Sequence, residues 1–372
     1  MLITLKNFLK NITEIKTSRK LLMFLSDDWG SVRIRSKHDQ NQLIKKGLNI
    51  NNRFDLYDAL ETNEDLERLF EVLMRHKDQQ GNHPVITAVF NVANPDFQRI
   101  KESGFKEYFY ETIESTYQRY ENSDQVLALI KKGITQGIFV PQSHGREHLQ
   151  VNWWMEELKN KRSYARNFFE HEYFFLGPEY LNFPKRNRGL GAAFDVWDKR
   201  DIEMQREVIQ TGLRDFRDLF GYRSRIFCPP AMFYNQQIET VLFKEGIEWL
   251  DVGRFFKTPQ VGGGHKWQLN YLGRKKQSGL RVLVRNGIFE PNISEKDNGV
   301  DRALFDVEHA FKTRQPAFLS NHRAAFTGRI DPKNREKGLR ALDELIGKIL
   351  KKWPDVEFVS LIDFLKIIEN DR

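Results

Sequence analysis

Residues 21–30, Leu-Leu-Met-Phe-Leu-Ser-Asp-Asp-Trp-Gly, are the stretch from which the fold is most directly predicted. Five apolar residues follow a basic segment and end on two carboxylates, a pattern typical of a buried β-strand. Barrels and open α/β sheets place their chemistry at the carboxyl ends of such strands. Because side chains alternate along a strand, Asp27 and Asp28 should point in different directions, so that one could bind a metal ion while the other acts as a base. Taken alone, an acidic pair close to a glycine is more typical of a turn.

The composition of the 372-residue chain is that of a globular protein, with 40% hydrophobic and 30% charged residues. A net charge of +8 and a pI of about 9.3 favour an anionic partner. No nucleic-acid-binding motif occurs, so no nucleic-acid partner is expected. The single cysteine, Cys228, excludes an intramolecular disulfide and a cysteine-based zinc site, and it suits a reducing compartment. Without a membrane-spanning apolar run or a signal-peptide pattern, a cytoplasmic protein with at most peripheral membrane contact is expected.

Further apolar runs follow at wide spacing and alternate with helical patterns. Strands are expected near residues 85–90, 138–140, 225–227, 247–250, 282–284, 316–319 and 356–359, with helices near 63–77, 123–132, 195–219, 235–245 and 333–351. This alternation predicts a parallel α/β sheet or barrel within one domain, residues 1–372.

Three segments depart from this alternation. Residues 1–20 have apolar residues at helical spacing, which predicts an amphipathic helix packed over one end of the domain or, alternatively, a weak membrane-surface anchor. Residues 150–195 are rich in aromatic side chains and are interpreted as an inserted, substrate-facing region. Residues 253–300 are glycine-rich and basic, and their Gly262–Gly264 run is expected to be a flexible loop.

Polar residues stand at the ends of four predicted strands: Asp27-Asp28, His144, Asp251 and His322. Strand ends of a parallel barrel meet on one face, so these side chains are expected to converge. His144 and His148 are four residues apart, and on one helical turn both imidazoles could bind the same metal ion.

The segment from His144 to His148 also fits His-x-x-Glu-His, a zinc-peptidase pattern in which Glu147 would be the base. That pattern belongs within a helix. Here a strand ends just before it and Ser143 resembles an N-cap, which favours a strand-to-helix corner.

The order of these motifs resembles the polysaccharide deacetylase family, the NodB-like carbohydrate esterases. Its Asp-Asp-Gly-type first motif is similar to residues 26–30, and its His-x-x-x-His motif is matched by His144 and His148. Its proline-rich strand end resembles residues 227–230, and its Leu-x-x-His motif resembles residues 319–322. The resemblance implies a distorted (β/α) barrel of about seven parallel strands with large loop insertions.

The resemblance also implies roles for individual residues. Asp28, His144 and His148 would bind a divalent metal, zinc first, with nickel, cobalt or iron as alternatives. Asp27 would be the general base and His322 the general acid. Ala231, Pro230, Arg33 and Asp251 would help to hold the substrate or the oxyanion.

The chain departs from the family pattern at three positions. Cys228 stands where the family usually has an arginine that orients the base, and Arg225 or Arg33 are possible replacements. Ala231 replaces an aromatic residue, and Asp251 only loosely resembles the family's fourth motif.

The sequence therefore predicts a metal-dependent hydrolase that removes an acetyl group from an N- or O-acetylated sugar in surface-glycan synthesis. The basic charge favours a nucleotide-linked or lipid-diphosphate-linked precursor as its substrate. Two alternatives remain open: a catalytically inactive sugar-binding protein on the same fold, and a metallopeptidase built on His144, Glu147 and His148.

Overall fold

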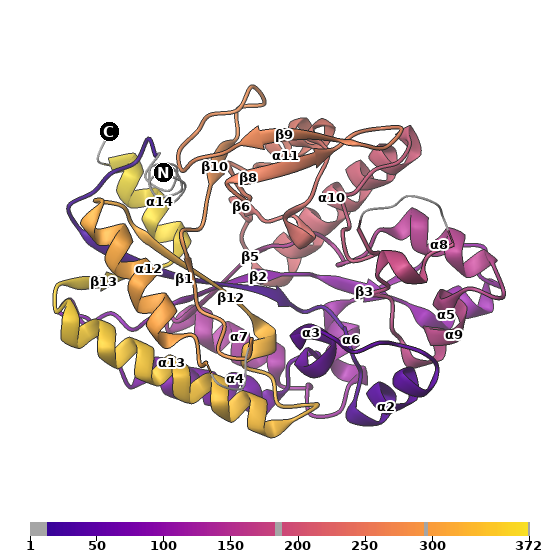
Figure 1. Ribbon diagram of the computed structural model, residues 1–372, viewed down its shortest axis with the longest axis horizontal. Coiled ribbons are helices and arrows are strands. Elements are labelled where there is room, and N and C mark those ends of the chain that lie inside the picture. The colour runs from indigo at the N-terminus through magenta and orange to yellow at the C-terminus, as the bar shows by residue number, and fades with distance from the viewer. Residues whose placement is uncertain (1–12, 183–187, 294–296, 371–372) are drawn as a thin grey trace.

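The computed structural model describes residues 13–182, 188–293 and 297–370, and it has a curled, parallel sheet at its centre (Figure 1). The strand order is β10-β7-β6-β5-β2-β1-β12-β11, and β13 pairs with the beginning of β1. These strands are β1 (Lys20–Trp29), β2 (Ile86–Phe90), β5 (Phe139–Ser143), β6 (Ile226–Phe227), β7 (Trp249–Asp251), β10 (Arg281–Leu283), β11 (Gly287–Ile288), β12 (Ala317–His322) and β13 (Val356–Phe358). The predicted α/β fold, a distorted barrel, is confirmed.

Strand β1 lies in the middle of the sheet and is buried from Leu21 to Trp29. It runs parallel to β12 on one side and to β2 on the other. A central strand of a parallel sheet is covered on both faces, which explains why its apolar residues run continuously instead of alternating with polar ones. In register with β12, Asp27 lies opposite His322, so the predicted base and the predicted acid are brought together by strand pairing.

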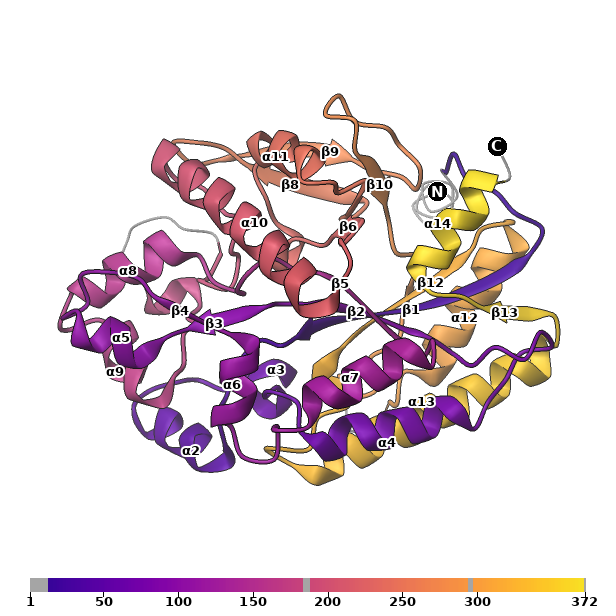
Figure 2. The same cartoon turned by 180° about the vertical axis from the view of Figure 1, so that it is seen from behind.

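Helices cover the convex face of the sheet. Figure 2 shows α4 (Asn63–Met74), α7 (Val126–Thr135) and α13 (Pro332–Lys352) side by side there, and α12 (Val300–Lys312) packs against α13. Their apolar faces join the sheet in the largest hydrophobic core of the structure. Helix α4 begins with a capping box, in which Thr62 and Asp65 each accept a hydrogen bond from the other's backbone N–H.

The remaining helices and strands surround the rest of the sheet. They are α2 (Lys37–Lys45), α3 (Arg53–Tyr57), β3 (Ala93–Pro95), α5 (Phe97–Glu102), β4 (Tyr110–Thr112), α6 (Ile113–Arg119), α8 (Val151–Lys159), α9 (Tyr164–Phe168), α10 (Lys199–Phe220), α11 (Glu239–Lys244), β8 (Phe255–Pro259), β9 (His265–Leu269) and α14 (Leu361–Asn370). The aromatic-rich residues near 150–195 build a second hydrophobic core around Trp154, Phe168 and Phe174.

Two expectations about local structure are wrong. Residues 13–19, within the predicted N-terminal helix, contain no helix, and Thr13 forms an isolated bridge with Leu272; residues 1–12 lie outside the described residues. The glycine run Gly262–Gly264 is the turn of an antiparallel hairpin, β8–β9, in which all three glycines have positive φ.

No helix among residues 13–182, 188–293 and 297–370 is long and apolar enough to cross a membrane.

Candidate active site

The end of β1 places Asp28 in an unusual backbone conformation. Asp28 has φ 73°, in the left-handed region, and the pairing of β1 with β2 shifts register between Ser26 and Trp29. Aspartate tolerates this region better than most residues, and such local strain is concentrated at functional sites. Gly30 is required next to it, because a Cβ at this position would lie 2.2 Å from the carbonyl oxygen of Asn91.

The Asp28 carboxylate lies between His144 and His148. Its Oδ1 is 3.2 Å from His144 Nε2 and 3.3 Å from His148 Nε2. One donor atom from each of these three buried residues lies within 4.8 Å of the other two. Burial alone would raise the pKa of Asp28, but hydrogen bonds from both histidines outweigh it and hold the pKa well below its usual range.

The two histidines lie in a loop, which corrects the expectation of a helix beginning at His144. The loop follows β5, and α8 begins only at Val151, where the Gln150 side chain caps the backbone N–H of Trp153. Gly145, with φ 96°, breaks the helical path. The backbone N–H of His144 donates to Phe90 O at 2.8 Å, which ties this loop to the end of β2.

This arrangement fits a divalent metal ion. His144 Nδ1 lies 2.7 Å from the carbonyl oxygen of Cys228 and donates to it, which would leave Nε2 as the ligand atom when a metal ion is bound. His148 Nδ1 is buried and has no hydrogen-bond partner. Two imidazole nitrogens and one carboxylate oxygen are the ligands of many catalytic zinc sites, and three protein ligands leave coordination positions open.

Asp27 points away from Asp28 and toward Arg285, a residue that the sequence analysis missed. Arg285 Nη1 and Nη2 donate to the two carboxylate oxygens of Asp27 at 2.7 and 2.6 Å, and its Nε donates to Asp251 Oδ2 at 2.8 Å. Arg285 follows β10 directly and its side chain is only 5% exposed. Arg285 therefore orients Asp27, the carboxylate that the usual arginine of polysaccharide deacetylases would hold. Cys228 lies beside Arg285, with its Sγ 3.6 Å from Nη2.

His322 contacts two carboxylates. Its Nδ1 forms a short hydrogen bond with Glu290, and its Nε2 is 3.9 Å from Asp27 Oδ2. Burial lowers the pKa of His322, but the charge and hydrogen bond of Glu290, together with the charges of Asp28 and Asp27, raise it to about 9. Arg53 in turn lies 3.0 Å from Glu290. Glu290, like Arg285, was not predicted, because no strand pattern or motif precedes it.

These groups border a pocket of about 550 Å³. Its lining residues are Asp27, Asp28, Arg33, Arg53, Phe54, His144, His148, Phe175, Leu176, Gly177, Arg188, Gly189, Gly191, Ala192, Cys228, Ala231, Met232, Ser320 and His322. The wall combines aromatic rings with arginines, since Arg33 lies 4.4 Å from the Phe175 ring centroid and Arg53 lies 4.6 Å from that of Phe54. A pocket of this size and lining accommodates one or two sugar rings or a comparable ligand.

The other predicted site residues have different surroundings. Ala231 lines the pocket with a left-handed backbone, φ 56°. Pro230 is buried beneath the wall. Arg33 is paired with Asp55 at 2.9 Å. Asp251 is fully buried behind Arg285, and burial raises its pKa.

Neither proposed replacement for the family's arginine contacts Asp27. Arg225, just before β6, pairs with Glu248 and Glu369, and the guanidinium of Arg33 is bonded to Asp55. Glu147, the base of the peptidase hypothesis, is fully buried and bonded to Arg146 at 2.6 and 2.9 Å. Because Glu147 is not among the pocket-lining residues, the geometry does not favour a peptidase.

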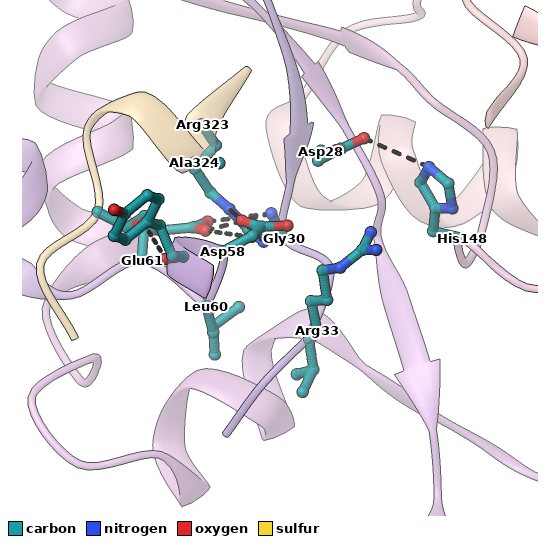
Figure 3. Close-up of polar contacts among 12 residues, drawn as sticks. Asp28, Gly30, Arg33, Asp58, Leu60, Glu61, His148, Arg323 and Ala324 are labelled. Atoms are coloured by element: carbon teal, nitrogen blue, oxygen red, sulfur yellow. Dashed lines mark hydrogen bonds and ion pairs between the residues drawn. The ribbon is translucent and has the colours of Figure 1, made fainter. Parts of the chain in front are cut away.

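A cluster of buried charged residues, Arg323, Asp58 and Glu61, lies beside the site (Figure 3). Arg323, the residue after His322, donates to Asp58 at 2.8 Å and to Glu61 at 2.7 Å. Glu61 accepts a hydrogen bond from the backbone N–H of Gly30 at 3.0 Å. The cluster thus joins the segment after β1 to the end of β12, the two strands that carry Asp28 and His322. Figure 3 shows it separate from the facing pair of Asp28 and His148.

Comparison with known families adds independent information. Residues 55–295 match the model of glycosyl hydrolase family 57, a match over more than half of the chain. The chain belongs to this family. The match includes both histidines of the site and Arg285, but it ends before His322 and begins after Asp28. Family membership and the fold together show a protein of the carbohydrate-acting hydrolase class.

The chain is also similar to solved structures, and the first of those that follow supports the fold. A glycoside hydrolase/deacetylase candidate from Parabacteroides distasonis matches with a TM-score of 0.51 and 10% identity, over 96% of this chain and 74% of that one. A polysaccharide deacetylase candidate from Mycobacterium smegmatis matches with a TM-score of 0.46 and 11% identity, over 97% and 95%. A branching enzyme of glycosyl hydrolase family 57 type from Pyrococcus horikoshii gives 0.43 and 11%, over 94% and 70%. No curated protein matches the sequence.

Proposed function

We propose that this member of glycosyl hydrolase family 57 is a metal-dependent deacetylase that acts on an N- or O-acetylated sugar. The observation that carries the proposal is the convergence of Asp28, His144 and His148 on one point of the pocket wall. A second carboxylate, Asp27, and a histidine, His322, lie beside them, 3.9 Å apart. This is the set of groups that metal-assisted acyl hydrolysis requires.

Asp28, His144 and His148 would hold the ion, with zinc first among the metals that such ligands suit. When bound, a divalent ion supplies Lewis acidity for an acyl oxygen and lowers the pKa of a water molecule. Asp27, oriented by two hydrogen bonds from Arg285, accepts the proton of the attacking water. His322, kept protonated at neutral pH by Glu290, donates a proton to the leaving nitrogen or oxygen.

Cleavage of a glycosidic bond is the second candidate, and membership of glycosyl hydrolase family 57 favours it. That reaction usually needs two carboxyl groups, one of them protonated as the general acid. Among the described residues that line the pocket, the carboxyl groups belong to Asp27 and Asp28. Asp27 is bonded to Arg285 and the pKa of Asp28 is lowered, so neither is suited to donate a proton. This supports acyl hydrolysis over glycoside hydrolysis.

Cys228 stands where polysaccharide deacetylases usually have an arginine, and this favoured the alternative of an inactive sugar-binding protein. The bidentate pairing of Arg285 with Asp27 supplies the same orientation from another strand, which supports an active enzyme. The arginines of the pocket support an anionic group on the substrate, such as the diphosphate of a nucleotide- or lipid-linked sugar.

The first test is the metal content of the purified protein, followed by assays of acetate release from acetylated sugars. We expect about one transition-metal ion per chain, acetate release that a chelator abolishes, and restoration by zinc or cobalt. The Asp28→Ala/His144→Ala double variant should lose the ion. Asp27→Asn should keep the ion and lose activity, because it removes the base and not a ligand.

A matched control is His171→Ala, which removes a histidine that pairs with Asp39 at 2.9 Å in the inserted region and not in the pocket. It should retain both metal and activity. A wild-type protein that binds no zinc, nickel, cobalt or iron would overturn the metal-dependent mechanism. Release of reducing sugar without acetate would instead support glycoside cleavage.

A further inference from the structure

The hairpin β8–β9 presents an apolar and basic face to solvent. In its antiparallel register Phe255 lies opposite Leu269, and Lys257 lies opposite Trp267. These outward side chains are 58%, 38% and 63% exposed for Phe255, Leu269 and Trp267. Residues on the other face of β8, Phe256 and Thr258, are buried. Figures 1 and 2 show the hairpin at the periphery of the molecule, beside α11.

The charge of the whole chain is concentrated around this hairpin. Residues 252–284 contain seven lysines and arginines and no aspartate or glutamate. The rest of the chain has 52 basic and 51 acidic residues, so that it is nearly neutral. Of these seven residues, Lys257, Lys266 and Lys275 are exposed and form a basic surface, whereas the Lys276 side chain is only 7% exposed and pairs with Glu239 at 2.8 Å. Such a surface attracts an anionic partner over a distance of about one Debye length, ~10 Å.

We propose that the β8–β9 hairpin docks on a lipid bilayer that contains anionic lipids. Phe255 and Leu269 offer apolar surface without hydrogen-bonding groups, which suits insertion between acyl chains better than contact with a hydroxyl-rich glycan. Tryptophan is enriched at membrane interfaces, and the Lys257 ammonium lies 4.7 Å from the Trp267 ring centroid, at the place where lipid phosphates would meet it. The exposed lysines of this segment, Lys257, Lys266 and Lys275, supply the electrostatic attraction to anionic headgroups.

The hairpin is also close to the pocket. The ring centroids of Phe233 and His265, the first residue of β9, are 5.7 Å apart. The guanidinium of Arg188, a pocket-lining residue, lies 4.7 Å from the centroid of the same Phe233 ring. One aromatic ring therefore connects the membrane-facing hairpin with the pocket wall. If the proposed function holds, docking would bring the pocket to a sugar carried by a lipid diphosphate.

The test is sedimentation of the full chain with vesicles of phosphatidylcholine, with and without about 30% phosphatidylglycerol. We expect binding to the anionic vesicles, weak binding to the neutral ones, and loss of binding when the salt concentration is raised several-fold. Phe255→Ala/Trp267→Ala should weaken binding at least about tenfold because it removes the inserting side chains. Lys257→Glu/Lys266→Glu should weaken it similarly by reversing charge.

Two matched controls separate the hairpin from general surface effects. Phe305 on α12 is 62% exposed, so Phe305→Ala removes an equally exposed ring elsewhere. Lys131→Glu/Lys132→Glu makes the same charge change on the exposed face of α7. Both controls should bind vesicles like the wild type. Absence of wild-type binding at low salt, equal loss in the controls, or binding of an acidic polysaccharide without vesicle binding would overturn the proposal.

Vesicle binding requires neither a bound metal nor turnover. Its failure would therefore leave the deacetylase proposal untouched, and an inactive protein that binds vesicles would leave the docking proposal standing.

Discussion

The orientation of Asp27 depends on Arg285, which is 258 residues away in the chain. Replacing Arg285 by alanine leaves two buried carboxylates, Asp27 and Asp251, without their cation. We expect Arg285→Ala to lower kcat/KM for the acetylated substrate roughly a hundredfold or more, because a misplaced base loses much of the benefit of positioning. Arg285→Lys should have an intermediate effect, since it keeps the charge but not the bidentate geometry.

The control for Arg285 is Arg225→Ala, which removes an arginine that pairs with Glu248 and Glu369 and does not contact Asp27. Its kcat/KM should be close to that of the wild type. Full activity in a folded Arg285→Ala variant would contradict the assignment of Asp27 as the base.

The pKa of His322, about 9, depends on Glu290. A general acid with this pKa is protonated at neutral pH, so kcat/KM should fall only as the pH rises through about 9. In Glu290→Gln the carboxylate charge that stabilises the imidazolium is absent, and the pKa falls toward its ordinary value of about 6.5. The basic limb of the pH profile should therefore move to lower pH. An unchanged limb would show that His322 is not the group that titrates.

At the scale of elements, the apolar runs predicted the strands well because each of those strands is buried in the sheet. Strand β11, with two residues, and the hairpin β8–β9 were missed, since an alternating exposed pattern interrupted by three glycines resembles a loop. The convergence of Asp28, His144 and His148 and the pairing of Asp27 with His322 agree with the sequence analysis, because these residues stand at strand ends or in a spaced motif, and their roles stay predictions.

Arg285 also stands directly after a predicted strand, residues 282–284, but neither its partners nor those of Glu290 could be read from the sequence. Their partners are fixed by the curl of the sheet, which brings the segment after β10 against the end of β1. A single sequence contains no local pattern for such a contact. The side chain of Arg285 is 5% exposed, and the carboxylates that it binds become apparent only in three dimensions.

Helix α10 supports the histidine loop through Gly212. A Cβ at Gly212 would lie 2.8 Å from Arg146 Cβ and 2.9 Å from its backbone nitrogen. We expect Gly212→Ala to displace residues 144–148 and weaken metal binding at least about tenfold, in keeping with the loss caused by disturbed ligand supports. Titration of the metal-free protein with zinc or cobalt measures this directly.

The matched control lies in α13, where Gly347 is also helical but a Cβ added to it would meet no other group within 4 Å. Gly347→Ala should leave metal affinity unchanged and raise the unfolding free energy by roughly 0.5–1 kcal/mol, from helix propensity alone. Equal metal affinity in both variants would show that the packing of α10 does not position the ligands.

At the scale of the whole molecule, the buried cluster around Arg323 links stability to the site. Arg323 and Glu61 are fully buried and Asp58 nearly so, and each carboxylate is bonded to the guanidinium. One cation then serves two carboxylates in a region from which water is excluded. Burial is the largest influence on Asp58 and raises its pKa to about 6, although the charge of Arg323 acts in the opposite direction.

This raised pKa predicts how stability depends on pH in the metal-free protein. The pKa of Asp58 is about 6 when folded and about 3.9 when unfolded, so between these values the folded state retains a proton that the unfolded chain has released. Asp58 therefore contributes stability that is complete below about pH 4 and is lost as the pH rises through about 6. Asp39, whose pKa is lowered, has the opposite dependence, so the contribution of Asp58 must be isolated by a variant.

Asp58→Asn isolates it, because asparagine can still accept a hydrogen bond from Arg323 but does not titrate. The unfolding free energy of the wild type minus that of the variant should fall by on the order of 2–3 kcal/mol between pH 4 and pH 7, at about 1.4 kcal/mol per unit of pKa shift. Denaturant unfolding after removal of metal measures both curves. If the unfolding free energies of the wild type and of Asp58→Asn change in parallel with pH, Asp58 is not the residue that keeps the proton. Glu61 would then be the next residue to replace. A difference confined to this pH range would show that the same buried charges that join β1 to β12 limit the stability of the chain at neutral pH.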